Sequence, residues 1–191
     1  MIWRARFSVP ALLARFEEKK VVSVVAAVNG GLAILAIGIF AWVTDLPLTY
    51  PALGPTAFIL FATPTALAAA PRSIVLGHFL GLASGYAVWH LVSMVAGEPV
   101  SSQSGGWPLF LSASLGLAVI CALLVWLSCP HPPACASALV VALGGVTDWF
   151  SVLLMGLAVV WMTAQAVAMN RLAGVPVLPW SSTVGTRPEP L

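Results

Sequence analysis

The stretch PALGPTA at residues 51–57 and the stretch CPHPPAC at residues 129–135 each interrupt an apolar region of this sequence. The apolar segment after each break is short compared with the about 20 residues that a membrane-spanning helix needs. Matching glycine and proline breaks in two halves of a chain are typical of membrane transporters, in which broken helices surround a substrate site. The two stretches therefore predict a helical membrane protein made of two similar halves.

The composition agrees with this prediction. Of the 191 residues, 60% are hydrophobic and only 7% are charged, and the mean hydropathy is +1.02. Soluble domains carry about 25% charged residues, so the composition indicates a polytopic protein of the lipid bilayer. The net charge of +2 is too small to indicate binding to nucleic acid.

Six apolar segments follow one another along the chain. They lie at about 21–43, 53–70, 73–95, 107–127, 132–146 and 148–169, and a polar connector at 97–106 divides them into two groups of three. The pattern predicts an all-α, polytopic membrane bundle of two three-segment repeats, at about 21–95 and 107–170, each with a short broken second segment. In this division residues 1–20 form a cytoplasmic or interfacial N-terminal segment, 21–170 the transmembrane domain, and 171–191 a mobile tail.

Loop charges predict the orientation. If all six segments cross and the basic N-terminus is cytoplasmic, the basic residues of the loops and tail fall inside and the acidic ones outside, as the positive-inside rule requires. The basic ones are Arg72, Arg171 and Arg187, and the acidic ones are Asp45, Glu98 and Asp148. We therefore expect a multi-pass protein of the cell membrane with both termini in the cytoplasm. In the alternative, the second and fifth segments are re-entrant, only four segments cross, and Arg72 lies outside.

The two breaks predict an anion site. A helix that starts inside a membrane protein leaves its first backbone N–H groups without partners, and this is unfavourable in hydrocarbon unless a ligand binds them. Those groups and the positive end of the helix dipole suit a small anion. The expected substrate-binding residues of the two breaks are Gly54, Pro55, Thr56 and Ala57, and His131, Pro132, Pro133 and Ala134. Alternatively, the prolines only kink ordinary spans whose freed groups are satisfied by neighbouring helices.

Three side chains extend this hypothesis. Thr56 and His131 add donors to the site, and Arg72 attracts anions at its cytoplasmic mouth. The unperturbed histidine side chain changes charge near neutral pH, so a histidine at this position is also suited to accept a proton that accompanies the anion. Alternatively, His131 lies in a hydrated loop at the membrane face.

Two other features of the sequence, a cysteine–histidine spacing and a glycine repeat, allow further interpretations. Cys129, His131 and Cys135 have a Cys-x-His-x3-Cys spacing, and the alternative interpretation is that they bind a metal ion. Because no fourth ligand lies nearby in sequence, we expect no metal or cofactor. A further set of small residues repeats every fourth position: Gly77, Gly81 and Gly85. It forms a stripe that permits close helix contact, either with Ser112 and Gly116 of the fourth segment or between copies in a homo-oligomer.

The sequence gives no sign of an enzyme. It contains no P-loop, dinucleotide fingerprint, nucleophile–base pair or carboxylate pair within the apolar segments.

The residues His131-Pro132-Pro133-Ala134 resemble the signature of the HPP family of integral membrane proteins. The stretch 51–61 and the pair Pro71-Arg72, followed by Gly77-His78, resemble the family in the same order along the chain. Together the resemblance covers about residues 21–169.

The resemblance implies a small helical membrane protein with about four spanning helices, which differs from the six segments counted above. Family members in chloroplasts and cyanobacteria are linked to nitrite transport. The family pattern marks Gly54, Pro55, Thr56, Pro71, Arg72, Gly77, His78, His131, Pro132 and Pro133. His78 thus joins the expected site through the resemblance.

The leading functional expectation is a transporter or channel-like carrier of a small monovalent anion, with nitrite as the best candidate. Movement of one repeat against the other would expose the site to each side in turn. The alternative is a membrane scaffold or sensor that transports nothing, in which the breaks and the glycine stripe are purely architectural.

Overall fold

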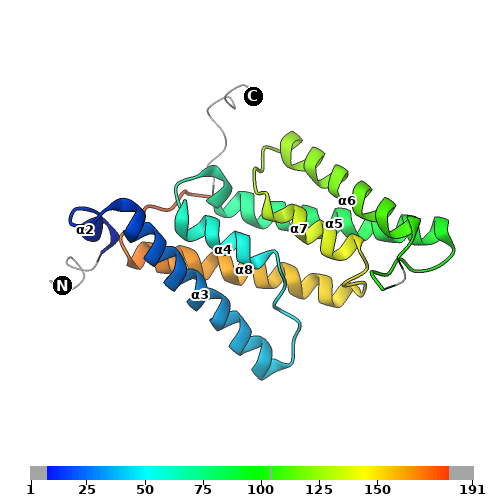
Figure 1. Ribbon diagram of the computed structural model, residues 1–191, viewed down its shortest axis with the longest axis horizontal. Helices are drawn as coiled ribbons and strands as arrows, with labels where there is room; N and C mark the ends of the chain where they lie inside the picture. Colours follow the sequence, from blue (N-terminus) through cyan, green and yellow to red (C-terminus); the bar gives the residue numbers. More distant parts are fainter. Residues whose placement is uncertain (1–7, 104, 181–191) are drawn as a thin grey trace.

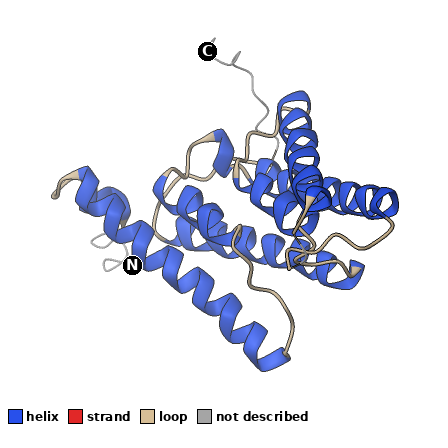
Figure 2. Ribbon diagram, turned by 45° about the vertical axis from the view of Figure 1, so that its right-hand side comes forward, coloured by secondary structure: helices blue, strands red, loops and turns tan. Residues whose placement is uncertain are grey.

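The computed structural model describes residues 8–103 and 105–180, and these residues form a bundle of helices (Figures 1 and 2). The elements, in chain order, are α2 (Val9–Leu13), α3 (Glu18–Thr44), α4 (Leu53–Ala62), the short 3₁₀ helix η1 (Leu67–Ala69), α5 (Pro71–Ala96), α6 (Trp107–Trp126), α7 (Pro133–Ala142) and α8 (Trp149–Leu172). No strand occurs among the described residues, and the predicted all-α class is confirmed. The end of the expected tail, from residue 181, lies outside the described residues.

Four helices are long and apolar enough to cross a membrane: α3, α5, α6 and α8, with 27, 26, 20 and 24 residues. The helices of the two broken segments, α4 and α7, have only 10 residues each. At 1.5 Å per residue they are about 15 Å long, half the thickness of the hydrocarbon core. The six-segment expectation is therefore corrected: four segments form full-length helices and two form half-length helices.

The half-length helices belong to segments that return through the bundle. In Figure 1, α3, α5 and α7 run one way and α4, α6 and α8 run the other way. The residues that line two cavities between α3 and α4 agree with this antiparallel pairing: Gly54 and Ile34 line one, and Phe61, Ala62 and Val22 line the other, nearer the start of α3. A re-entrant segment would end on the side where it entered, and these segments do not.

Local sequence explains where several helices begin. Proline is the first residue of both α5 and α7, where its missing N–H group leaves no donor unpaired. Asp148 caps α8, since its Oδ1 accepts a 2.8 Å hydrogen bond from the backbone N–H of Ser151. This bond stabilises the carboxylate and lowers the pKa of Asp148 below its usual value.

The glycine stripe packs α5 against α7 of the same chain. Gly77, Gly81 and Gly85 are all buried. A methyl group on Gly81 would overlap the carbonyl oxygen of Ala134, and one on Gly85 would overlap that of Ala138. In this structure α7 therefore covers the stripe, and Ser112 and Gly116, which the sequence suggested as its complement, contact Ala142 of α7 instead.

The free carbonyl groups near the ends of the half-length helices are bound by side chains of full-length helices. Asn170 of α8 donates a 2.9 Å hydrogen bond from Nδ2 to the carbonyl oxygen of Leu60 in α4. Ser112 of α6 donates a 2.6 Å bond from Oγ to the carbonyl oxygen of Ala142 in α7. A helix that ends inside the bundle needs such partners, because water does not reach these carbonyls.

Ser112→Ala is expected to lower the free energy of unfolding by about 1–3 kcal/mol, since it leaves the buried Ala142 carbonyl without its side-chain donor. The matched control is Ser114→Ala, because Ser114 is exposed on the same helix. Thermal unfolding of both variants in detergent measures the difference. Equal melting temperatures would show that the Ser112 bond contributes nothing to stability.

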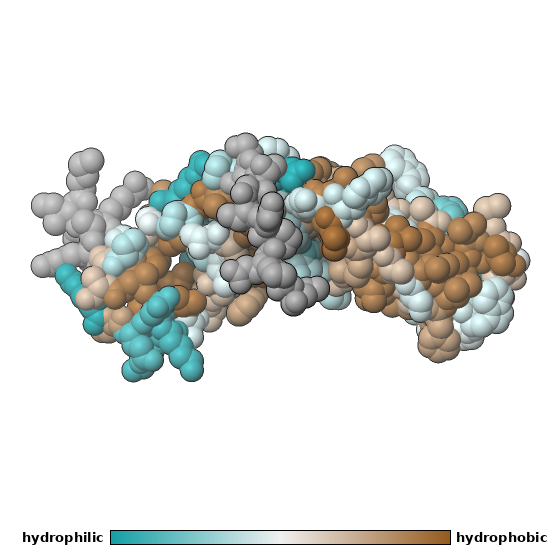
Figure 3. Space-filling view, turned by 90° about the horizontal axis from the view of Figure 1, so that it is seen from above, coloured by the Kyte–Doolittle hydropathy of each residue, from teal (hydrophilic) through white to brown (hydrophobic). Residues whose placement is uncertain are grey.

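The outer surface is apolar. Trp42, Met94 and Trp126 are each at least 80% exposed, and apolar residues cover much of the bundle in Figure 3. These side chains lie near the ends of three of the long helices, where membrane proteins carry their aromatic belts. Lipid would cover such a surface in a bilayer.

Candidate functional site

The starts of α4 and α7 meet inside the bundle. Thr56 lies in the first turn of α4, and His131 lies two residues before the start of α7. Thr56 Oγ1 lies 3.3 Å from His131 Nε2, and both residues are fully buried. From this point α4 and α7 run in opposite directions (Figure 1). The two sequence breaks, 75 residues apart in the chain, therefore lie together in the structure.

Four polar side chains form the centre of this junction. We call Thr56, His78, His131 and Ser137 the central polar cluster, and all four have a relative exposure of 0%. Nε2 of His78 lies 2.9 Å from Thr56 Oγ1 and 3.1 Å from His131 Nε2, and Nδ1 of His78 lies 2.6 Å from Ser137 Oγ. The cluster thus combines one residue each from α4, α5, the second break and α7.

Backbone carbonyl groups fix the hydrogen positions of the cluster. Nδ1 of His131 lies 2.7 Å from the carbonyl oxygen of Ala68, and a carbonyl only accepts, so this nitrogen carries a hydrogen. Nε2 of a neutral His131 is then an acceptor, and His78 donates toward it from Nε2. The tautomer of His78 that donates from Nε2 accepts from Ser137 at Nδ1, and Thr56 donates to the carbonyl oxygen of Ala52 at 2.8 Å.

The backbone amides at the two helix starts have partners, which differs from the sequence-based expectation. Gly54 N–H donates to the carbonyl of Pro51, and Thr56 N–H to that of Ala52. Ala134 N–H donates to the carbonyl of His131 at 3.0 Å. Tight turns at both starts satisfy these donors, and the adjacent prolines have none. The polar centre is therefore made of side chains, and these amides are not free in this conformation.

The other expected site residues surround the cluster without joining it. Gly54, Pro55 and Pro132 are exposed, whereas Ala57, Pro133 and Ala134 are buried in packing contacts. Arg72 begins α5 six residues before His78, about 9 Å along the helix.

Sequence reasoning missed one member of the cluster. Ser137 is a small polar residue inside an apolar helix, and its only sequence signal is its position four residues after Pro133, one helical turn into α7. His78 came from the family resemblance alone, because nothing else in the sequence pairs α5 with the second break.

The cysteine residues do not converge with His131. Sγ of Cys135 lies 3.9 Å from Sγ of Cys121 in α6, and Cys129 donates to the carbonyl of Leu127. Within the part of the chain that the structure describes, no three His, Cys, Asp or Glu side chains are grouped to hold a metal ion. The metal alternative therefore has no geometric support.

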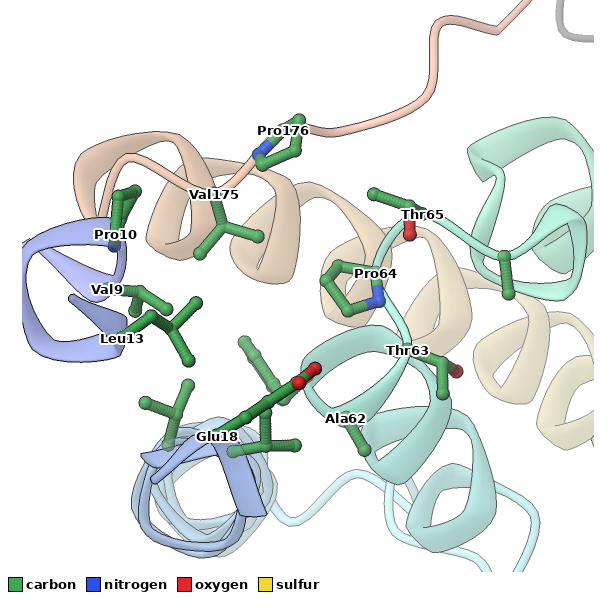
Figure 4. Close-up of a pocket in the computed structure, with 14 residues that line it drawn as sticks. Val9, Pro10, Leu13, Glu18, Ala62, Thr63, Pro64, Thr65, Val175 and Pro176 are labelled. Atoms are coloured by element: carbon green, nitrogen blue, oxygen red, sulfur yellow. The ribbon is translucent and has the colours of Figure 1, made fainter. Parts of the chain in front are cut away.

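The cluster is closed to solvent in this structure. A pocket of about 510 Å³ lies between α2, α3 and the end of α4, with the Glu18 carboxylate directed into it (Figure 4). A groove of about 620 Å³ lies between α3 and α4, where Gly54 and Ala57 line it. Neither is lined by a member of the central polar cluster.

Four spanning helices that enclose two opposed half-length helices define a multi-pass helical membrane protein with a broken-helix core. The family model "HPP, transmembrane region" matches residues 17–177, a stretch that includes every helix from α4 to α8 and nearly all of α3. The chain therefore belongs to the HPP transmembrane family. No protein of the curated collection and no solved structure matches it.

Proposed function

We propose that this protein carries a small monovalent anion across the membrane, with nitrite as the first candidate. The observation that supports the proposal is the central polar cluster, which lies where two half-length helices start inside the bundle. Transporters place their substrate sites at such interruptions near the middle of the membrane.

The electrostatics of the junction favour an anion. The N-terminal ends of α4 and α7 both point toward the cluster, and a helix N-terminus carries a partial positive charge. The described acidic residues lie at helix ends or in loops: Glu17, Glu18, Asp45, Glu98 and Asp148. An anion would accept from His78 Nε2–H and from the hydroxyl groups of Thr56 and Ser137, in exchange for bonds that these groups now make to one another.

The cluster also lies between the two repeats. Thr56 and His78 belong to the first repeat, and His131 and Ser137 to the second. Three of their contacts, His78–Ser137, His78–His131 and Thr56–His131, therefore join one repeat to the other. Movement of one repeat against the other would separate these pairs and open the site, as alternating access requires.

Charge supports an orientation with both termini in the cytoplasm. Arg72 begins α5 and Arg171 lies in the last turn of α8, at the end of the bundle where α3 begins. Asp45, Glu98 and Asp148 follow or precede helices at the opposite end. The positive-inside rule assigns the first end to the cytoplasm. Arg187, which the sequence analysis also placed inside, lies outside the described residues.

The test is uptake by purified protein in liposomes. Nitrite, nitrate, formate and chloride are supplied outside, and initial uptake is compared with that of protein-free liposomes. We expect saturable uptake of at least nitrite. A correctly folded protein that moves none of these anions would contradict the proposal and favour the scaffold alternative. One observation already agrees with that alternative: every buried side-chain N or O atom of the described residues has a hydrogen-bond partner.

A further inference from the structure

We propose that each anion is carried together with one proton, and that the facing Nε2 atoms of His78 and His131 bind this proton. The inference rests on the proposed function and deepens it, because it makes the protein an electroneutral proton–anion symporter. Three features of the cluster carry it: the hydrogen-bond pattern, the depth of burial, and the groups that surround the pair.

The gap between the two imidazole rings holds one hydrogen. The Nε2 atoms lie 3.1 Å apart, which is the length of a single N–H···N hydrogen bond. The Ala68 carbonyl holds the hydrogen of His131 on Nδ1, so Nε2 of His131 offers its lone pair to the gap. A hydrogen bond across the gap requires the tautomer of His78 that carries its hydrogen on Nε2, where Thr56 Oγ1 is a second acceptor at 2.9 Å, and Nδ1 of this tautomer accepts from Ser137. Without an anion, the two imidazole rings therefore share one hydrogen bond and carry no net charge.

An anion alone does not fit this arrangement. Any anion that approaches both rings meets the lone pair of His131 Nε2, which repels it. It would also bring a net negative charge into a fully buried site, at a large desolvation penalty.

A proton alone does not fit either. It would add to the lone pair of His131 Nε2 and place two N–H groups against each other across 3.1 Å. It would also leave a positive charge buried without a counter-ion.

The two together remove both difficulties. The added proton forms a bond to His131 Nε2, no bond breaks, and both rings then present an N–H group to the gap. A monovalent anion between them accepts both hydrogen bonds and neutralises the charge. The rings must move apart to admit it.

Few other titratable groups lie near the pair. From the stretch before α4, Tyr50 presents its ring 6.5 Å from that of His78, and its hydroxyl donates to the carbonyl of Met155 and also hydrogen-bonds Ser137, so it contacts the far side of His78 and not the gap between the rings. Cys129 lies in the second break and donates to Leu127, and Cys135 of α7 is paired with Cys121 of α6. On α5 the nearest charge is Arg72, two turns away, and the charged residues of α8, Asp148 and Arg171, lie at its ends.

The experiment follows internal pH while the protein takes up nitrite. Proteoliposomes hold a pH-sensitive dye, and their membrane potential is clamped with potassium and an ionophore. Protein-free liposomes correct for diffusion of nitrous acid, and nitrate serves as a second probe whose acid is almost fully ionised. We expect one proton to enter with each anion, and we expect the rate of uptake not to change when a membrane potential is imposed. An inward proton gradient of one pH unit should accumulate the anion inside the liposomes about tenfold.

The outcomes separate this inference from the proposed function. Uptake that follows the membrane potential without internal acidification would overturn proton coupling and leave an anion carrier. Absence of uptake would overturn both. A proton-to-anion ratio of one that persists in His131→Gln would also overturn the inference, because glutamine keeps a polar group there but binds no proton. The matched control is His90→Gln on α5, where the histidine is exposed and should leave coupling unchanged.

Discussion

His131→Ala is expected to reduce the initial rate of anion uptake by about 10- to 100-fold. A hydrogen bond to a charged group contributes about 1.5–3 kcal/mol, and each 1.4 kcal/mol is a factor of ten. The substitution removes both ring nitrogens: Nε2, which faces His78, and Nδ1, which holds the ring on the Ala68 carbonyl. Uptake by proteoliposomes with equal amounts of each protein measures the effect.

Two controls make this result specific. His90→Ala also removes an imidazole ring from the chain, at an exposed position of α5, and is expected to transport at the normal rate. Size-exclusion chromatography in detergent should show that His131→Ala is inserted and folded. Normal uptake by a folded His131→Ala variant would remove this residue from the mechanism.

Gly81→Val is expected to destabilise the protein strongly, and in most preparations to prevent recovery of folded material. The first added carbon would overlap the carbonyl oxygen of Ala134, which belongs to backbone and cannot turn aside. Overpacking of a close-packed interior costs about 1–3 kcal/mol even when side chains can adjust. Here α5 and α7 would have to separate, and this would also disturb His78 and Ser137.

Gly31→Val is the matched control for Gly81→Val. Gly31 lies within α3, and an added carbon there meets nothing within 4 Å. Valine is a slightly better helix former than glycine, so the control should be neutral or slightly stabilising. Yield and thermal unfolding in detergent measure both variants, and equal melting temperatures would show that the α5–α7 contact tolerates a side chain.

Much of the fold follows from local sequence. Apolar runs of more than 20 residues predict helices that cross a membrane, because a helix satisfies its own backbone in hydrocarbon. The prolines of the second break indicate a helix start, and the structure begins α7 at Pro133. The glycine stripe correctly indicated close packing, but a stripe carries no information about which helix it faces, and α7 as its partner came only from the structure.

The candidate site was predicted less completely. The breaks contain Thr56 and His131, whose side chains lie 3.3 Å apart in the structure. Their neighbours Gly54 and Pro55 face outward, since consecutive helical residues point in different directions. The amide groups expected to bind the anion are satisfied by turns whose geometry the sequence did not reveal.

The sequence by itself determined that this chain is an all-helical membrane protein of the HPP family with two interrupted segments. Hydropathy and proline act through neighbouring residues, so their consequences are readable along the chain. Only the tertiary structure decided that His78 meets Ser137 and His131, which are 59 and 53 residues away in sequence. Such contacts depend on how whole helices pack, and here the glycine face of α5 brings α7 close enough for the polar side chains to join.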